Sequence, residues 1–216
     1  MSKLTHIAGL AALALMAGVA LAASDQPVGE DAVEAVVIGD VVKPGRGSEK
    51  VEVPFLLLKD GRAYQEEAAS PLDFLPSSRP FGSWGVFTWA RVPGGYRLTA
   101  PNGGTEDLRE AGRLGPDGAR LQGTYRAGGD GGGRSWSEVV SFDGRGSYRL
   151  EQSQSMQGGG MMGGGGSQWT GNYRASGWTI TTEGFGRSPE RKLFAVGPES
   201  TRVVVGAMVY RTSTRF

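Results

Sequence analysis

The chain has 216 residues, with 23 Lys and Arg against 22 Asp and Glu, no Cys, and a single His at position 6. A formal net charge of +1 gives no electrostatic reason to expect binding to nucleic acid. Without Cys, and with its one His in the first residues, the rest of the chain has no Ser-His-Asp triad, no Cys-His pair and no zinc site with nitrogen or sulfur ligands. We therefore expect a protein that is not an enzyme and has no cofactor or metal.

Residues 1–22 have the pattern of a secretory signal peptide. A polar start that includes Lys3 precedes an apolar run ending in Ala-Leu-Ala. The run is too short and too rich in Ala and Gly for a typical membrane anchor. We expect cleavage before Ala23 and export to the periplasm or the medium. No Cys follows the cleavage point, so no lipid anchor is expected.

The sequence predicts a mobile polar leader over residues 23–31, followed over residues 32–113 by N-terminal β hairpins that pack with a downstream barrel. Short β-branched and aromatic runs alternate here with turn residues. An example is VEVPFLLLKDGRAYQ, in which Asp60-Gly61 supplies the tight turn of a hairpin. Residues 70–81 and 105–112 are each expected to hold one short helical turn.

Residues 114–216 predict an antiparallel meander that curls into a barrel or sandwich, so the predicted fold class is all-β. One hairpin is expected around Asp143-Gly144. Two glycine-rich stretches, residues 127–133 and 153–168, are expected to be flexible loops at one end of the sheet. The reason is that glycine loses the most backbone entropy when it is ordered.

The motif Gly-x-Tyr-Arg occurs four times and places its tyrosines at Tyr96, Tyr125, Tyr148 and Tyr173. In a strand its Gly and Tyr share one face and its Arg points to the other. One interpretation is architectural. On strands that run in the same direction, Gly bends the chain, Tyr buries its ring, and Arg faces solvent or a cross-strand carboxylate such as Glu138 or Glu151. The alternative is that the four rings line one concave mouth that holds a ligand.

Two tryptophans extend this second interpretation. Trp136 shares a strand face with Val140 and Phe142, and Trp178 shares one with Ile180, as expected for either a core or a ligand-lining wall. The candidate ligand-lining residues are Tyr96, Tyr125, Tyr148, Tyr173, Trp136 and Trp178. The expected partners are an apolar or glycan small molecule, or a protein of the cell envelope.

The segments LQGTYR, WSEVVSFDGRGSYRL, GNYRASGWTITTE, RKLFAV and VVVGAMVYRTS resemble the lipocalin-like β-meander domains of uncharacterised exported bacterial proteins. By pattern, the resemblance covers roughly residues 50–212. It implies an up-and-down, barrel-like fold and no particular activity. The long glycine-rich stretch and the additional leading half depart from a minimal eight-stranded lipocalin.

Two alternatives accompany the prediction of an exported binding or envelope-associated module. An integral outer-membrane barrel is suggested by the aromatic Phe216 at the end of MVYRTSTRF, although Thr212 and Thr214 would then face lipid. A hydrolase would have to use carboxylates. The adjacent pairs Glu66-Glu67 and Glu106-Asp107 point to opposite faces of a strand, so such an enzyme would need acids from distant parts of the chain.

Overall fold

The computed structural model describes residues 25–42, 50–110, 121–131, 134–158, 161–184, 187–197 and 200–213. Within these residues the chain forms fourteen strands with short 3₁₀ turns, which confirms the predicted all-β class. The predicted signal peptide and its cleavage point lie outside the described residues. No helix in the described part of the chain is long and apolar enough to cross a membrane.

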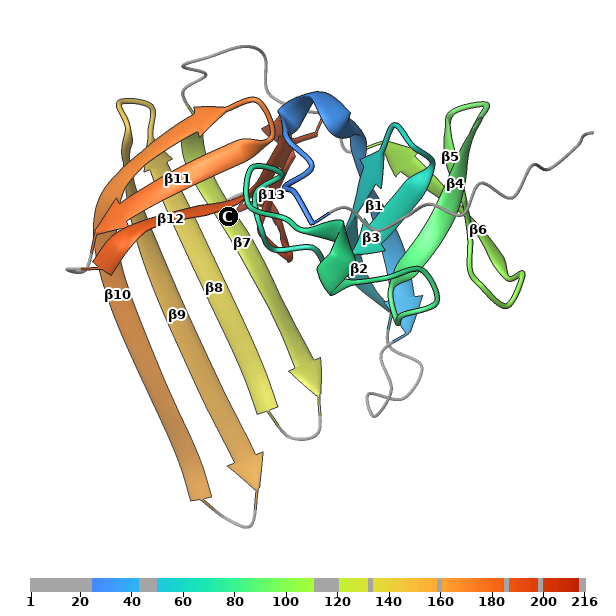
Figure 1. The fold of residues 1–216 in the computed structure, drawn as a ribbon. Coiled ribbons are helices and arrows are strands. Elements are labelled where there is room, and N and C mark those ends of the chain that lie inside the picture. The colour runs from blue at the N-terminus through green and yellow to red at the C-terminus, as the bar shows by residue number, and fades with distance from the viewer. Residues whose placement is uncertain are drawn as a thin grey trace, which may run out of the picture.

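The first six strands form a closed antiparallel barrel in which each strand pairs with the next (Figure 1). They are β1 (Val33–Val42), β2 (Lys50–Leu58), β3 (Arg62–Gln65), β4 (Val86–Val92), β5 (Gly95–Thr99) and β6 (Thr105–Glu110). The barrel is closed by β6, which pairs with β1 at Val37 and Ile38. The predicted hairpin at Asp60-Gly61 joins β2 to β3, with Gly61 at a φ of 89°.

The remaining eight strands form a second closed barrel, again with every strand next to its sequence neighbour. They are β7 (Gln122–Gly131), β8 (Arg134–Asp143), β9 (Ser147–Gly158), β10 (Met161–Ser176), β11 (Thr179–Gly184), β12 (Arg187–Val196), β13 (Arg202–Val205) and β14 (Met208–Thr212). Pairing of β14 with β7, at Arg211 with Arg126 and Thr212 with Tyr125, closes it. This confirms the predicted meander curled into a barrel.

The two barrels share a wall of buried side chains. In β1, Ala35 and Val37 point into the first barrel, while Val36 and Ile38 pack against the second. This two-sided burial explains why β1 reads as a nearly continuous apolar run. The second barrel contributes Trp178, Leu193, Ala195 and Val204 to the shared cluster.

The predicted mobile leader over residues 23–31 is wrong at its end. Residues 30–32 form the 3₁₀ turn η1 (Glu30–Ala32), which is held against the second barrel. The Glu30 carboxylate accepts a hydrogen bond of 2.5 Å from the backbone N–H of Trp178 and another from the Thr179 hydroxyl. A Cβ at Gly177 would collide with that carboxylate, so the turn between β10 and β11 leaves room for Glu30.

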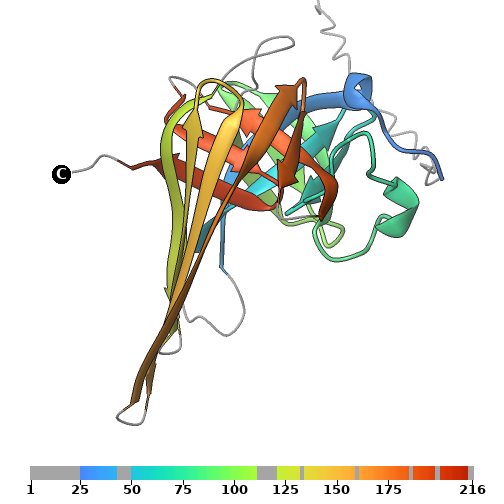
Figure 2. The same ribbon diagram turned by 90° about the vertical axis from the view of Figure 1, so that its left-hand side faces the viewer.

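The predicted glycine-rich loops at residues 127–133 and 153–168 are also wrong, because the described residues of both stretches belong to strands β7 to β10. Gly128 pairs with Ser137, and Gly163 to Gly166 pair in unbroken register with Met156 to Ser153. The low strand propensity of glycine is overridden because hairpin pairing that starts in the barrel continues outward. We call residues 128–131, 134–137, 153–158 and 161–167 the extension, which projects beyond the barrel (Figures 1 and 2).

The two predicted helical turns have different outcomes. Residues 70–81 contain the 3₁₀ turn η2 (Pro76–Ser78), as expected. Residues 105–110 instead form β6, so the second prediction is wrong there. Cross-strand partners decide this: Leu108 is buried opposite Tyr96, and Asp107 accepts two hydrogen bonds from Arg97.

Candidate functional site

The glycines of the Gly-x-Tyr-Arg motifs show why the motif recurs. Gly94, Gly123 and Gly146 have φ values of 81°, 135° and 105°, in the left-handed region that glycine adopts without steric cost. At three of its four occurrences the motif therefore begins with a bend that leads into a strand. This part of the architectural interpretation is confirmed.

The fourth occurrence works differently. A Cβ on Gly171 would lie 2.9 Å from Cε1 of Tyr148 and would collide with the carbonyl oxygen of Glu183. The bare backbone of Gly171 thus allows the ring of Tyr148 to lie over it. Tyr173 is on β10, antiparallel to the β9 strand that holds Tyr148. The expectation that all four tyrosines lie on strands of one direction is therefore wrong.

The motif arginines point outward and pair on the barrel surfaces. Arg97 forms an ion pair with Asp107 at 2.6 Å, and Arg149 forms one with Glu151 at 2.7 Å. Glu151 does pair with an arginine, but Arg149 lies on the same strand, so the predicted cross-strand contact of Glu151 is wrong. Glu138, the other predicted partner, instead lies among the residues that line the inside of the second barrel.

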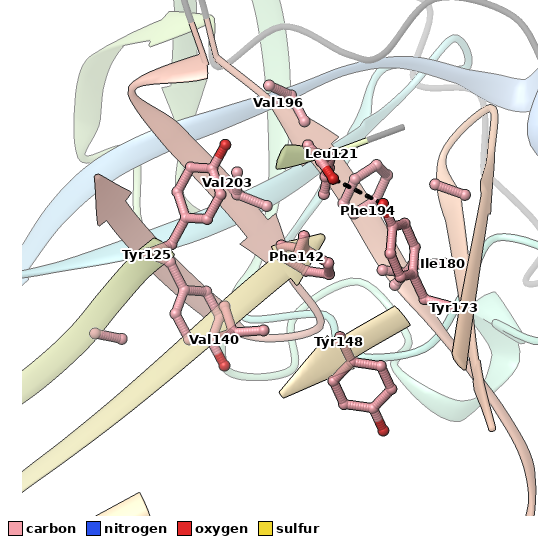
Figure 3. Close-up of a cluster of buried hydrophobic side chains, with 13 residues drawn as sticks. Leu121, Tyr125, Val140, Phe142, Tyr148, Tyr173, Ile180, Phe194, Val196 and Val203 are labelled. Atoms are coloured by element: carbon pink, nitrogen blue, oxygen red, sulfur yellow. Dashed lines mark hydrogen bonds between the residues drawn. The ribbon is translucent and has the colours of Figure 1, made fainter. Parts of the chain in front are cut away.

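The four motif tyrosines do not line a common cavity. Tyr96 lies in the core of the first barrel, where its hydroxyl accepts a hydrogen bond of 2.8 Å from Arg91. Tyr125 and Tyr173 lie in the packed core of the second barrel, and the Tyr173 hydroxyl donates to the Leu121 carbonyl at 2.9 Å (Figure 3). The hypothesis of a single wall made from four tyrosines is therefore wrong.

The other three candidates have three different surroundings. Trp178 is buried in the wall between the barrels. Trp136 lines a polar hollow of about 740 Å³ beside the closing strand β14. Tyr148 alone of the six predicted residues lines the cavity inside the second barrel, and burial raises the pKa of its hydroxyl.

This cavity has a volume of about 670 Å³, is lined by strands of the second barrel and is partly open to solvent. Its apolar wall is formed by aromatic and aliphatic side chains from most of the strands around it: Val140, Phe142, Tyr148, Leu150, Trp169, Ile180 and Val205. Its polar residues include Glu138, Gln152, Thr182, Ser188, Glu190, Lys192 and Tyr210. The packed core of Figure 3 continues into the apolar wall through Phe142, Tyr148 and Ile180.

A hydrogen-bonded group from three strands lies in the cavity wall. Glu138 on β8 accepts one hydrogen bond from the Tyr210 hydroxyl on β14 and another, of 2.6 Å, from Gln152 Nε2 on β9. Burial, and next to it the charge of Glu138, raises the pKa of Tyr210 far above its ordinary value. The Tyr210 hydroxyl therefore keeps its proton and donates a hydrogen bond to Glu138.

The charges of the cavity do not balance. Glu190 and Lys192 form an ion pair of 3.2 Å between neighbouring positions of the same face of β12. With Glu138 they are the charged side chains among the described lining residues, so two carboxylates and one ammonium leave one net negative charge. Among the described residues, no Lys or Arg forms an ion pair with Glu138.

Comparison of the chain with protein-family models, curated protein sequences and solved structures gives no match. No group of three or more His, Cys, Asp or Glu among the described residues is arranged to hold a metal ion.

The sequence contained a signal for Glu138 that was missed. Strand alternation places it on the same face as Trp136, Val140 and Phe142, the face already predicted to be buried or ligand-lining. We expected instead that a charged residue would face solvent. Gln152 lies opposite Glu138 in the register of the β8–β9 hairpin. Tyr210 had no such signal, because its closeness to Glu138 depends on barrel closure.

Proposed function

We propose that this protein is an exported binding module that holds a small, largely apolar ligand inside its second barrel. The observation that carries the proposal is the cavity of about 670 Å³, which falls within the typical range of small-molecule sites. Its walls combine aromatic and aliphatic surface with a few converging polar groups, the composition that such sites usually have.

The polar groups of the cavity favour binding over catalysis. A glycosidase-type mechanism needs two carboxylates that act together across a bond. Here Glu138 is engaged by Tyr210 and Gln152, while Glu190 is engaged by Lys192. Each carboxylate therefore has its own protein partners, which suits orientation of a ligand.

The outer face of the barrel favours an aqueous compartment over the alternative of an integral membrane barrel. Arg149, Glu151 and Arg174 are exposed on β9 and β10, where a membrane barrel would face lipid. Charged side chains in that position are costly. The proposal predicts that osmotic shock releases the protein from the cell envelope, and retention in the detergent-extracted outer membrane would contradict it.

Binding in the cavity can be tested with the neutral apolar dye N-phenyl-1-naphthylamine. We expect its fluorescence to rise when it is mixed with the protein. In Leu150→Trp a larger ring fills the cavity, so the rise should be lost. Thr170→Trp places the same ring on the exposed face of neighbouring β10 and should leave the rise unchanged. No rise, or an equal rise in all three proteins, would exclude the cavity as a binding site.

A further inference from the structure

We propose that the ligand of this cavity is an amphiphilic amine, with an apolar body inside the barrel and an ammonium group bound to Glu138. This inference rests on the proposed binding function and names the chemical class of the ligand. Three observations lead to it: the position of Glu138, the charge of the cavity, and the donors that already hold the carboxylate.

Glu138 lies on the inner face of β8, the face that also holds Val140, and it is opposite Gln152 on β9. Each of its two oxygens accepts one hydrogen bond from a protein donor. A carboxylate has about four acceptor positions, so about two are left. Because Glu138 lines the cavity, these positions are open to a molecule bound there.

The surroundings of Glu138 make a positive partner favourable. Val140, Leu150 and Val205 give this part of the cavity a wall of low polarity. A carboxylate in such a setting attracts a cation more strongly than it would in water. Lys192 already pairs with Glu190, so the described lining offers no cation to Glu138, and a positively charged ligand would balance its charge.

The two protein partners of Glu138 also determine whether the ligand must donate or accept hydrogen bonds at this carboxylate. Tyr210 keeps its proton because burial raises its pKa, and Gln152 presents its amide nitrogen. The carboxylate thus has only acceptor positions to offer. An ammonium group carries three donors, whereas a carboxylate ligand carries none and would meet a like charge.

The proposal can be tested with three probes that share one alkyl chain: decylammonium, decanol and decanoate. Calorimetric titration of the wild-type protein should give the affinity order decylammonium, then decanol, then decanoate. Glu138→Gln should weaken decylammonium by about tenfold or more, because a charge-assisted bond is replaced by a neutral one, and should change decanol little. Glu151→Gln removes the same charge from the outer face of neighbouring β9 and should change none of the three.

The outcomes separate this inference from the proposed function. If the three probes bind with equal affinity, or if decanoate binds best, the ligand is not an amine but the cavity is still a binding site. If decylammonium binds equally to wild type and Glu138→Gln, Glu138 is not its partner and the inference is wrong. If neither the probes nor the neutral dye bind, the proposed function itself fails. The wild-type ranking requires no variant, so the test stands even if Glu138→Gln does not fold.

Discussion

At the scale of single residues, the position of a carboxylate in the strand alternation decides its role. Glu138 and Glu151 lie on adjacent strands of the same barrel, and their side chains point to opposite faces. Glu151 is exposed and pairs with Arg149, an arrangement that typically contributes little to stability. Glu138 faces the cavity and draws donors from two other strands.

Asp143 shows a third role, in the turn between β8 and β9. Its carboxylate accepts hydrogen bonds from the N–H groups of Arg145 at 2.7 Å and Ser147 at 2.9 Å, which lower its pKa. A lowered pKa in the folded state means that the carboxylate stabilises the fold above its ordinary pKa of about 3.9. This stabilisation is lost as the pH falls through the lower folded value.

We therefore predict that Asp143→Asn melts below the wild type at neutral pH and that the difference shrinks as the pH is lowered. Thermal melts followed by circular dichroism from neutral to strongly acidic pH would show the two melting temperatures converging. A difference that stays constant over the whole range would mean that the charge of Asp143 is not the cause.

At the scale of elements, the extension is where sequence reasoning failed most clearly. Its glycines were interpreted through their own propensity, yet strands β9 and β10 stay paired from the barrel to Met161. Pairing in an antiparallel hairpin propagates register outward, and every backbone can form these bonds whatever its side chain. The glycine-rich composition of the extension therefore did not predict its backbone conformation, which is paired strand and not loop.

Two glycines of β10 give a matched pair for testing this account. A Cβ on Gly165 would meet no atom within 4 Å, whereas one on Gly171 would meet Tyr148 and the Glu183 carbonyl. Gly165→Ala should be neutral or stabilise the protein by about 0.4–1 kcal/mol, since alanine lowers the entropy of the unfolded chain. Gly171→Ala should destabilise it by about 1–3 kcal/mol, because the strands must separate locally.

Urea unfolding of both variants and the wild type would measure these changes. Equal effects at the two positions would show that the contacts of Gly171 do not matter to the fold. A large loss of stability in Gly165→Ala would show that residue 165 is not in an open, extended strand.

At the scale of the whole molecule, we expect the two barrels to unfold as one unit because they share a wall. The wall joins apolar side chains of β1 and β2 to those of β12 and β13. At its margin Glu52 of the first barrel forms ion pairs with Arg202 and Arg211 of the second, at 3.4 and 2.8 Å. Neither barrel could expose this face to water without losing the burial that stabilises it.

We predict that Leu193→Ala, which opens a hole in this wall, lowers the free energy of unfolding by about 2–5 kcal/mol. Amide hydrogen exchange should accelerate together in β2 of the first barrel and β12 of the second. If only the second barrel lost protection, the two barrels would be independent domains. Leu72→Ala, at an exposed leucine, is the control and should change stability little.

The sequence by itself determined the all-β class, the meander order of the strands, the hairpins at Asp60-Gly61 and Asp143-Gly144, and the burial of the motif tyrosines. These features depend on strand alternation and turn residues, which act over a few neighbouring positions. Only the tertiary structure decided that there are two closed barrels, that Tyr96 lies in a different core from the other three motif tyrosines, and that Tyr210 reaches Glu138. These features depend on barrel closure, which brings together residues as far apart in sequence as Tyr125 and Thr212, and local patterns do not encode such pairings.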